Sequence, residues 1–302
     1  MKILYFNYVH QARGAMVQMD QFSRAFRALG HEITLVSLDR APDDATPPVS
    51  SKRRNGHGPL KTLLHPWLHE TNSVLKNFKW LREERAWLQR VQPEAVLVRH
   101  KPYHLSHLWS ARTIHRPVVL WVHSPGAVER EQFDHSYHRL PWVARACERA
   151  AWRGADRLIV VSEELKAYCV GQGVEEARIQ VIPNGVDTER FHPQLDGAAQ
   201  RRALGLDGRF VAGFVGSFSP WHGIPTLLRV MERLGRTIPH LTFLLVGDGP
   251  LRAEVAERVQ RAGGPPVVFL GQVPTQTFLG RLQPWIAVCC RMNRSRCFIS
   301  RL

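Results

Sequence analysis

The sequence has no long apolar run, because its hydrophobic stretches are only as long as a β-strand. None of them could cross a membrane as a helix. Residues 1–8 also lack the succession of charged, apolar and small residues that marks a signal peptide. The five cysteines fall in no metal-ligand spacing, which favours reduced thiols. We therefore expect a cytoplasmic protein without a metal centre.

Several catalytic signatures are missing as well. There is no G-x-S-x-G elbow, no H-E-x-x-H pair and no EF-hand loop, so hydrolase and metalloenzyme interpretations lack their residues. The first glycine-bearing loop reads QARGAMVQ and contains neither the dinucleotide fingerprint nor a P-loop.

Negative charge is scarce: 26 Asp and Glu face 41 Lys and Arg, a net charge of +15 that calls for a polyanionic neighbour. Many of the basic residues lie in residues 52–90, interleaved with Trp67, Phe78, Trp80 and Trp87. This mixture suits a peripheral contact with an anionic membrane. The alternative, a solvated helix face with a few core aromatics, stays open.

Short runs rich in Val, Ile and Leu recur along the chain without alternating, which is typical of parallel strands buried on both faces. They are residues 2–6, 33–38, 95–99, 117–123, 157–162, 179–183, 209–216, 241–247 and 266–271. Turn-forming residues follow Pro183, and a second βα series then begins. The pattern predicts an α/β protein with two Rossmann-like domains facing a cleft, over residues 1–195 and 196–302.

Three glycine-bearing turns between a strand and a helix could present backbone N–H groups to a phosphate. Plain structural turns are the alternative reading. The candidate residues are Gly14 in the first domain, and Gly216, Ser217, Ser219, His222, Gly223, Gly247, Asp248 and Gly249 in the second. In the third turn, Pro250 is expected at the first position of the following helix.

His123 ends the run PVVLWVH, at the edge where parallel sheets place their ligands, and is the candidate catalytic residue. His100, His104 and His107 have helical spacing but no carboxylate neighbour in the sequence. We therefore expect no metal site there.

Taken in order, four segments resemble glycosyltransferase family 4. They are residues 181–187 (VIPNGVD), 214–223 (FVGSFSPWHG), 245–250 (LVGDGP) and 269–274 (FLGQVP). The resemblance implies a GT-B fold with an acceptor-side first domain and a nucleotide-sugar-binding second domain. It implies transfer of a sugar from a nucleoside diphosphate sugar to a glycan or lipid-linked acceptor, with retention, and without a metal or other cofactor.

By the same resemblance, Gly14 lies near the donor phosphate and His123 faces the donor sugar. Many members carry arginine at the position of Ser217 and lysine at that of His222. Another branch has lysine where this chain has Ser219. Hydroxyls and a neutral imidazole supply less charge than these cations.

The family's glutamate pair has no counterpart, since no Asp or Glu follows Glu257. Residues 289–297 are rich in arginine and cysteine and do not resemble the family. We expect a truncated or frameshifted, incomplete second domain. Two alternatives remain: an inactive remnant, or a basic nucleic-acid-binding protein, although the primary interpretation expects no nucleic acid.

Overall fold

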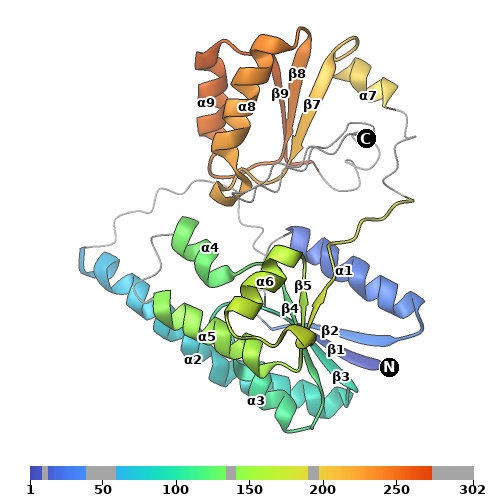
Figure 1. Ribbon diagram of the computed structural model, residues 1–302, viewed down its shortest axis with the longest axis vertical. Coiled ribbons are helices and arrows are strands. Elements are labelled where there is room, and N and C mark those ends of the chain that lie inside the picture. Colours follow the sequence, from blue (N-terminus) through green and yellow to red (C-terminus); the bar gives the residue numbers. More distant parts are fainter. Residues whose placement is uncertain (9–12, 39–58, 134–140, 190–196, 274–302) are drawn as a thin grey trace. The chain divides into compact units, whose positions relative to one another are not determined.

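The computed structural model describes residues 1–8, 13–38, 59–133, 141–189 and 197–273. These residues form two compact units that divide between Asn184 and Gly185 (Figure 1). Each unit is described by itself below.

The first unit is a parallel six-stranded sheet with the strand order β2-β1-β3-β4-β5-β6 (Figure 1). Its strands are β1 (Lys2–Asn7), β2 (Glu32–Ser37), β3 (Ala95–Arg99), β4 (Val118–Val122), β5 (Arg157–Val160) and β6 (Ile179–Val181). Its helices are α1 (Arg13–Ala28), α2 (Pro59–Val91), α3 (Ser106–Arg112), α4 (Gly126–Phe133), α5 (Pro141–Gly154), α6 (Glu163–Gly171) and the 3-10 turn η1 (Glu176–Arg178).

Both faces of this sheet are covered. On one face, Met19, Phe22 and Phe26 of α1 pack against Tyr5 and Trp121. On the other face, α2, α3, α5 and α6 contribute a larger core with residues such as Trp80, Leu88, Trp152 and Leu165. Burial on both faces explains why the strand sequences do not alternate between apolar and polar residues.

The second unit contains a parallel sheet in the order β7-β8-β9. Its elements are α7 (Ala198–Ala203), β7 (Phe210–Val215), the 3-10 turn η2 (Pro220–His222), α8 (Ile224–Thr237), β8 (Leu241–Val246), α9 (Arg252–Ala262) and β9 (Val267–Gly271). Every residue of the central strand β8 is buried. Helices α8 and α9 pack on one face through Leu228, Met231 and Val255, while Leu206 covers part of the other.

All nine predicted strands are present and parallel, so the α/β class with two Rossmann-like units is confirmed. Two expectations fall outside the described residues. One is the domain boundary at residue 195, which stays a prediction although the contact division lies at Gly185. The other is the tail that begins at residue 274.

The basic and aromatic segment forms most of α2. Trp80 is buried at 3% exposure and Trp87 packs against the core, so these two aromatics belong to the interior. Phe78 and Leu75 are 72% and 59% exposed. Lys79, Arg82 and Arg85 are exposed on the same helix. Within the described ranges, every helix is too short or too polar to serve as a membrane span.

Candidate functional site

The two glycine-bearing loops of the second unit pack directly against each other through their backbones. A Cβ atom on Gly247, which has φ +129°, would lie 1.9 Å from the carbonyl oxygen of Gly216. A Cβ atom on Gly249 would lie 2.7 Å from the backbone nitrogen of Phe218. Only glycine permits this approach. The N–H of Phe218 donates to the carbonyl of Asp248 at 3.1 Å, which closes the contact.

The same packing includes the ends of all three strands of this sheet. The N–H of Gly216 donates to the carbonyl of Val246 at 3.0 Å, and that of Gly247 to Gly271 at 2.7 Å. The loops therefore lie at the carboxyl edge of the sheet, where parallel sheets bind their ligands. The predicted turns at 216–223 and 247–250 are brought together there.

Polar side chains converge on the first of these loops. The hydroxyl of Ser217 lies 2.9 Å from that of Ser219 and 3.0 Å from Nδ1 of His222. Nδ1 also contacts the carbonyl oxygen of Ser217. Because a carbonyl only accepts, Nδ1 carries the hydrogen in this contact. Gly223 then adopts a left-handed conformation with φ +66° and caps α8.

Asp248 has an organising role in the structure. Its Oδ1 accepts from the N–H of Gly249 at 2.8 Å, which fixes the turn from within. The expectation that Pro250 opens the next helix is wrong, because α9 begins at Arg252. The N–H of Leu251 donates to the carbonyl of Phe218 at 2.9 Å, so a turn that contains Pro250 precedes the helix.

Gly14 belongs to the other unit. It was expected in a loop before a helix, but it lies in the first turn of α1, which begins at Arg13. Residues 9–12, which precede this helix in the sequence, lie outside the described residues.

His123 directly follows β4, and its ring packs against that of Trp121 in a tilted arrangement, with centroids 4.7 Å apart. Glu148 of α5 stabilises the turn that follows His123. The Oε1 atom of this buried carboxylate accepts from Nε2 of His100 at 2.9 Å and lies 3.4 Å from the N–H of Ala127, in the first turn of α4. Glu148 thus supplies the negative charge that a helix N-terminus favours.

The histidines lack a carboxylate neighbour in the sequence, but the fold brings two carboxylates to them: Glu148 contacts His100 and Glu84 contacts His104. Glu84 of α2 is fully buried and accepts from Nε2 of His104 at 3.1 Å. It also accepts from three hydroxyl groups, those of Tyr8, Ser106 and Ser110, at 2.5 to 2.6 Å.

Burial changes the protonation of this cluster. It raises the pKa of Glu84, against the opposing effect of the hydroxyl donors. It holds the pKa values of His104 and His107 well below their usual range, so both rings are neutral at pH 7. No arrangement of three or more His, Cys, Asp or Glu side chains suited to a metal occurs among the described residues.

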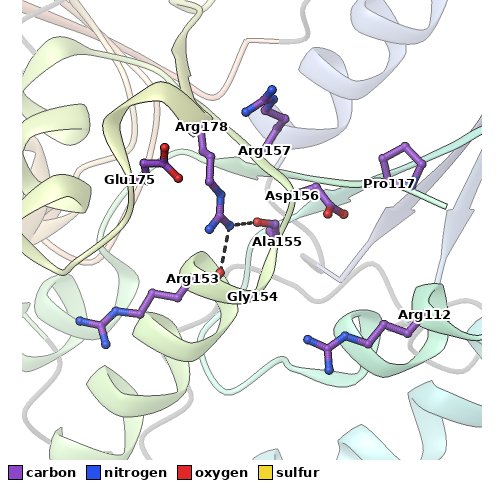
Figure 2. A pocket seen from close by; sticks show the side chains of 9 residues that line it. All are labelled: Arg112, Pro117, Arg153, Gly154, Ala155, Asp156, Arg157, Glu175 and Arg178. Atoms are coloured by element: carbon purple, nitrogen blue, oxygen red, sulfur yellow. Dashed lines mark hydrogen bonds between the residues drawn. The ribbon is translucent and has the colours of Figure 1, made fainter. Parts of the chain in front are cut away.

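A cavity of about 660 Å³ lies at the opposite edge of the first sheet, where β4 and β5 begin (Figure 2). The Arg178 guanidinium donates to the carbonyls of Arg153 and Ala155, at the end of α5. That of Arg153 donates to the carbonyl of Gln172, after α6. These arginines stabilise the negative ends of helices, so the cavity has a structural explanation.

Sequence reasoning missed two residues at the carboxyl edge of the first sheet, Arg99 and Glu148. A charged residue that ends the apolar strand AVLVR is a signal that would have found Arg99. Glu148 carried no such signal, because it lies on an amphipathic helix 48 residues away from its partner His100.

Comparison with known proteins identifies the family. The model of Glycosyltransferase Family 4 matches residues 12–190. A second model, Glycosyl transferases group 1, matches residues 209–291. The two matches fall on the two units of the structure.

Curated relatives include a D-inositol 3-phosphate glycosyltransferase of Corynebacterium urealyticum, 31% identical over 59% of this chain and 38% of the relative. The corresponding enzyme of Corynebacterium jeikeium is 28% identical over 78% of this chain and 54% of its own. A 2-deoxystreptamine glucosyltransferase of Streptomyces kanamyceticus is 27% identical over 85% of this chain and 70% of its own. The chain thus spans about two fifths to half the length of the first two.

Solved structures share the fold. Sucrose-phosphate synthase from Thermosynechococcus elongatus superimposes with a TM-score of 0.63 at 22% identity, covering 93% of this chain and 72% of that chain. Anabaena HepE in complex with UDP-glucose gives 0.59 at 20% identity, covering 91% and 70%. The expected GT-B resemblance is confirmed. Since the first family model covers more than half of the sequence, this chain belongs to glycosyltransferase family 4.

Proposed function

We propose that this protein transfers a sugar from a nucleoside diphosphate sugar to a glycan or lipid-linked acceptor, with retention and without a metal. The single observation that carries the proposal is the locked pair of loops in the second unit. The two glycine-bearing loops are held together at the carboxyl edge of the sheet, with the hydroxyl groups of Ser217 and Ser219 gathered beside the His222 ring. Family membership supports the reaction class.

In this proposal the donor diphosphate binds at Gly216–Gly223 and Gly247–Gly249. Hydroxyl groups and backbone N–H groups stabilise the charge that develops as the diphosphate leaves, and the His222 ring orders the loop through its contacts with Ser217. Asp248 keeps the second loop in place through its bond to Gly249. Of the first unit, we propose Gly14 as a donor-binding residue and His123 as the catalytic residue.

Names of related proteins guide the choice of ligands. Similar structures contain UDP or UDP-glucose, and relatives act on an inositol phosphate or on 2-deoxystreptamine. We propose a uridine nucleotide as the first donor to test, with GDP- and ADP-sugars beside it.

The test is a titration of the purified chain with UDP-, GDP- and ADP-sugars, followed by the thermal unfolding of the second unit. A ligand at 100 times its Kd stabilises the folded state by about 2.7 kcal/mol. Gly249→Ala is expected to abolish the shift, because its methyl group would press on Phe218. Gly264→Ala is the matched control, since nothing lies within 4 Å of its Cβ position. No response to any nucleotide in the unmodified chain would contradict the proposal.

We also propose that the protein works in the cytoplasm and contacts an anionic membrane through α2. The exposed Leu75 and Phe78 lie beside the exposed cations Lys79, Arg82 and Arg85. Apolar side chains beside cations are the combination that binds lipid surfaces.

A further inference from the structure

Arg99 is a buried cation at the ligand edge of the first sheet. It is the last residue of β3 and is only 8% exposed. Its Nη1 donates to Oε1 of Gln18 on α1 at 2.9 Å. The Nε2 atom of Gln18 in turn donates to Oδ1 of the exposed Asn184 at 2.5 Å. This chain of contacts leads from the guanidinium to the surface of the unit.

The charge of Arg99 has no counter-ion in the part of the chain that the structure describes. No Asp or Glu there forms an ion pair with it. Its neighbour Tyr5 cannot supply one, because burial raises the pKa of Tyr5 to about 12 and keeps it neutral. Burial also lowers the pKa of Arg99, yet a guanidinium remains charged at pH 7.

An uncompensated buried charge lowers stability, and a side chain needed only for packing would be apolar. Two buried carboxylates of this unit are compensated by hydrogen bonds: Glu84 accepts four and Glu148 accepts one from His100. Arg99 therefore fits a ligand-binding group better than a structural one.

Strand geometry places Arg99 near His123. Leu97 and Trp121 belong to the same apolar cluster, on the α1 face of the sheet. Arg99 follows Leu97 by two residues and is paired in register with Trp121, and His123 follows Trp121 by two residues. Because side chains two residues apart share a face, Arg99 and His123 leave the sheet on the same side of neighbouring strands.

We propose that Arg99 binds a phosphate group of the acceptor. The assignment to the acceptor rests on the proposed function, which gives the donor diphosphate to the second unit. A guanidinium offers two parallel donors to a phosphate, which matches this chemistry better than a neutral sugar. The phosphate belongs either to a soluble sugar phosphate or to a lipid headgroup.

Binding is tested on the full chain by the Nε–H resonance of Arg99 in NMR titrations. The probes are glucose 6-phosphate, its neutral counterpart glucose, and vesicles of phosphatidylcholine with or without phosphatidylglycerol. We expect a saturable shift with one phosphate source and none with glucose, and binding at least about ten-fold weaker in Arg99→Gln. An unmoved resonance with every phosphate probe, or equal binding of glucose, would overturn the proposal.

Stability gives a second readout that a structural role would not produce. Arg99→Met is expected to unfold at the same temperature or higher without ligand, because it removes a charge that lacks a counter-ion. Arg112→Met is the control, since Arg112 is exposed at the opposite edge of the sheet, and it should leave phosphate binding unchanged. A clearly lower melting temperature for Arg99→Met would show that the cation serves the fold and would refute the assignment.

These measurements do not depend on turnover. Loss of nucleotide binding with an intact Arg99 response would reject the proposed function alone. Nucleotide binding with a silent Arg99 would reject the acceptor site alone.

Discussion

At the scale of single residues, Glu148 connects His100, which follows β3, with Ala127 at the start of α4. Its Oε1 accepts hydrogen bonds from Nε2 of His100 and from the N–H of Ala127, and so it fixes the start of α4. His123 is only three residues before that helix. A carboxylate that touches no ligand can therefore set the position of the candidate catalytic ring.

Glu148→Ala is expected to lower kcat of the proposed sugar transfer about ten-fold while the proposed nucleotide affinity of the second unit stays unchanged. It should also lower the free energy of unfolding by about 1 to 3 kcal/mol, because it leaves the buried Nε2 of His100 without its hydrogen-bond partner. Glu148→Gln keeps the oxygen that accepts from Ala127 and should recover most of kcat. Steady-state kinetics and urea unfolding give the two numbers.

The control is Val174→Ala, a truncation of a buried residue in the same core. If it lowered kcat as much as Glu148→Ala, the effect would come from general destabilisation. The positioning role would then be wrong.

At the scale of elements, strands were easier to predict than polar contacts. Most strands are short, largely apolar runs, because both faces of the sheet are covered, and this pattern is local in the sequence. The contacts of Glu84 are not local: Tyr8 lies 76 residues away and Ser106 lies 22 away. No spacing rule could join them before α2 was packed on the sheet.

Helix α2 also shows why composition alone left two interpretations open. Trp80 and Phe78 are two residues apart, so one faces the core and the other faces solvent. Which of the aromatics are exposed depends on how the helix docks, and the sequence of residues 52–90 does not contain that information.

We expect the double substitution Leu75→Ser and Phe78→Ser to weaken binding to vesicles that contain phosphatidylglycerol by at least about ten-fold. It removes two exposed apolar side chains, each worth about 1.5 kcal/mol or more when fully buried in lipid. Co-sedimentation measures the change. Trp109→Ser on α3 is the matched control, being an exposed aromatic on another helix. Equal binding of the double variant and the parent would contradict a role for α2.

At the scale of the whole molecule, the two units differ in how they respond to acid. His104 and His107 are buried and neutral in the first unit, and their lowered pKa values make protonation easier after unfolding. The stability that they contribute is therefore fully present above about pH 6.5 and is lost as the pH falls. In the described part of the second unit, no histidine is buried.

The first unit is expected to lose up to about 1.4 kcal/mol per histidine for each pH unit below 6.5. The raised pKa of Glu84 opposes this loss at lower pH, because its acid form is favoured in the fold. His107→Leu should reduce the slope, since neither ring nitrogen of this buried residue has a hydrogen-bond partner. Urea unfolding at pH 7 and 5.5, with probes in each unit, measures this, and a parallel response of the two units would contradict it.

The contact between Gly247 and Gly216 has a consequence for engineering. The backbone frame of the two loops depends on glycines that tolerate no side chain, whereas the polar groups around it sit on Ser217, Ser219 and His222. The residues that set the backbone conformation are thus different from those that carry the polar side chains. New cations introduced at the exposed Ser217 would alter which anions are retained while the scaffold beneath them stays intact, so this loop is a natural starting point for redesigning selectivity.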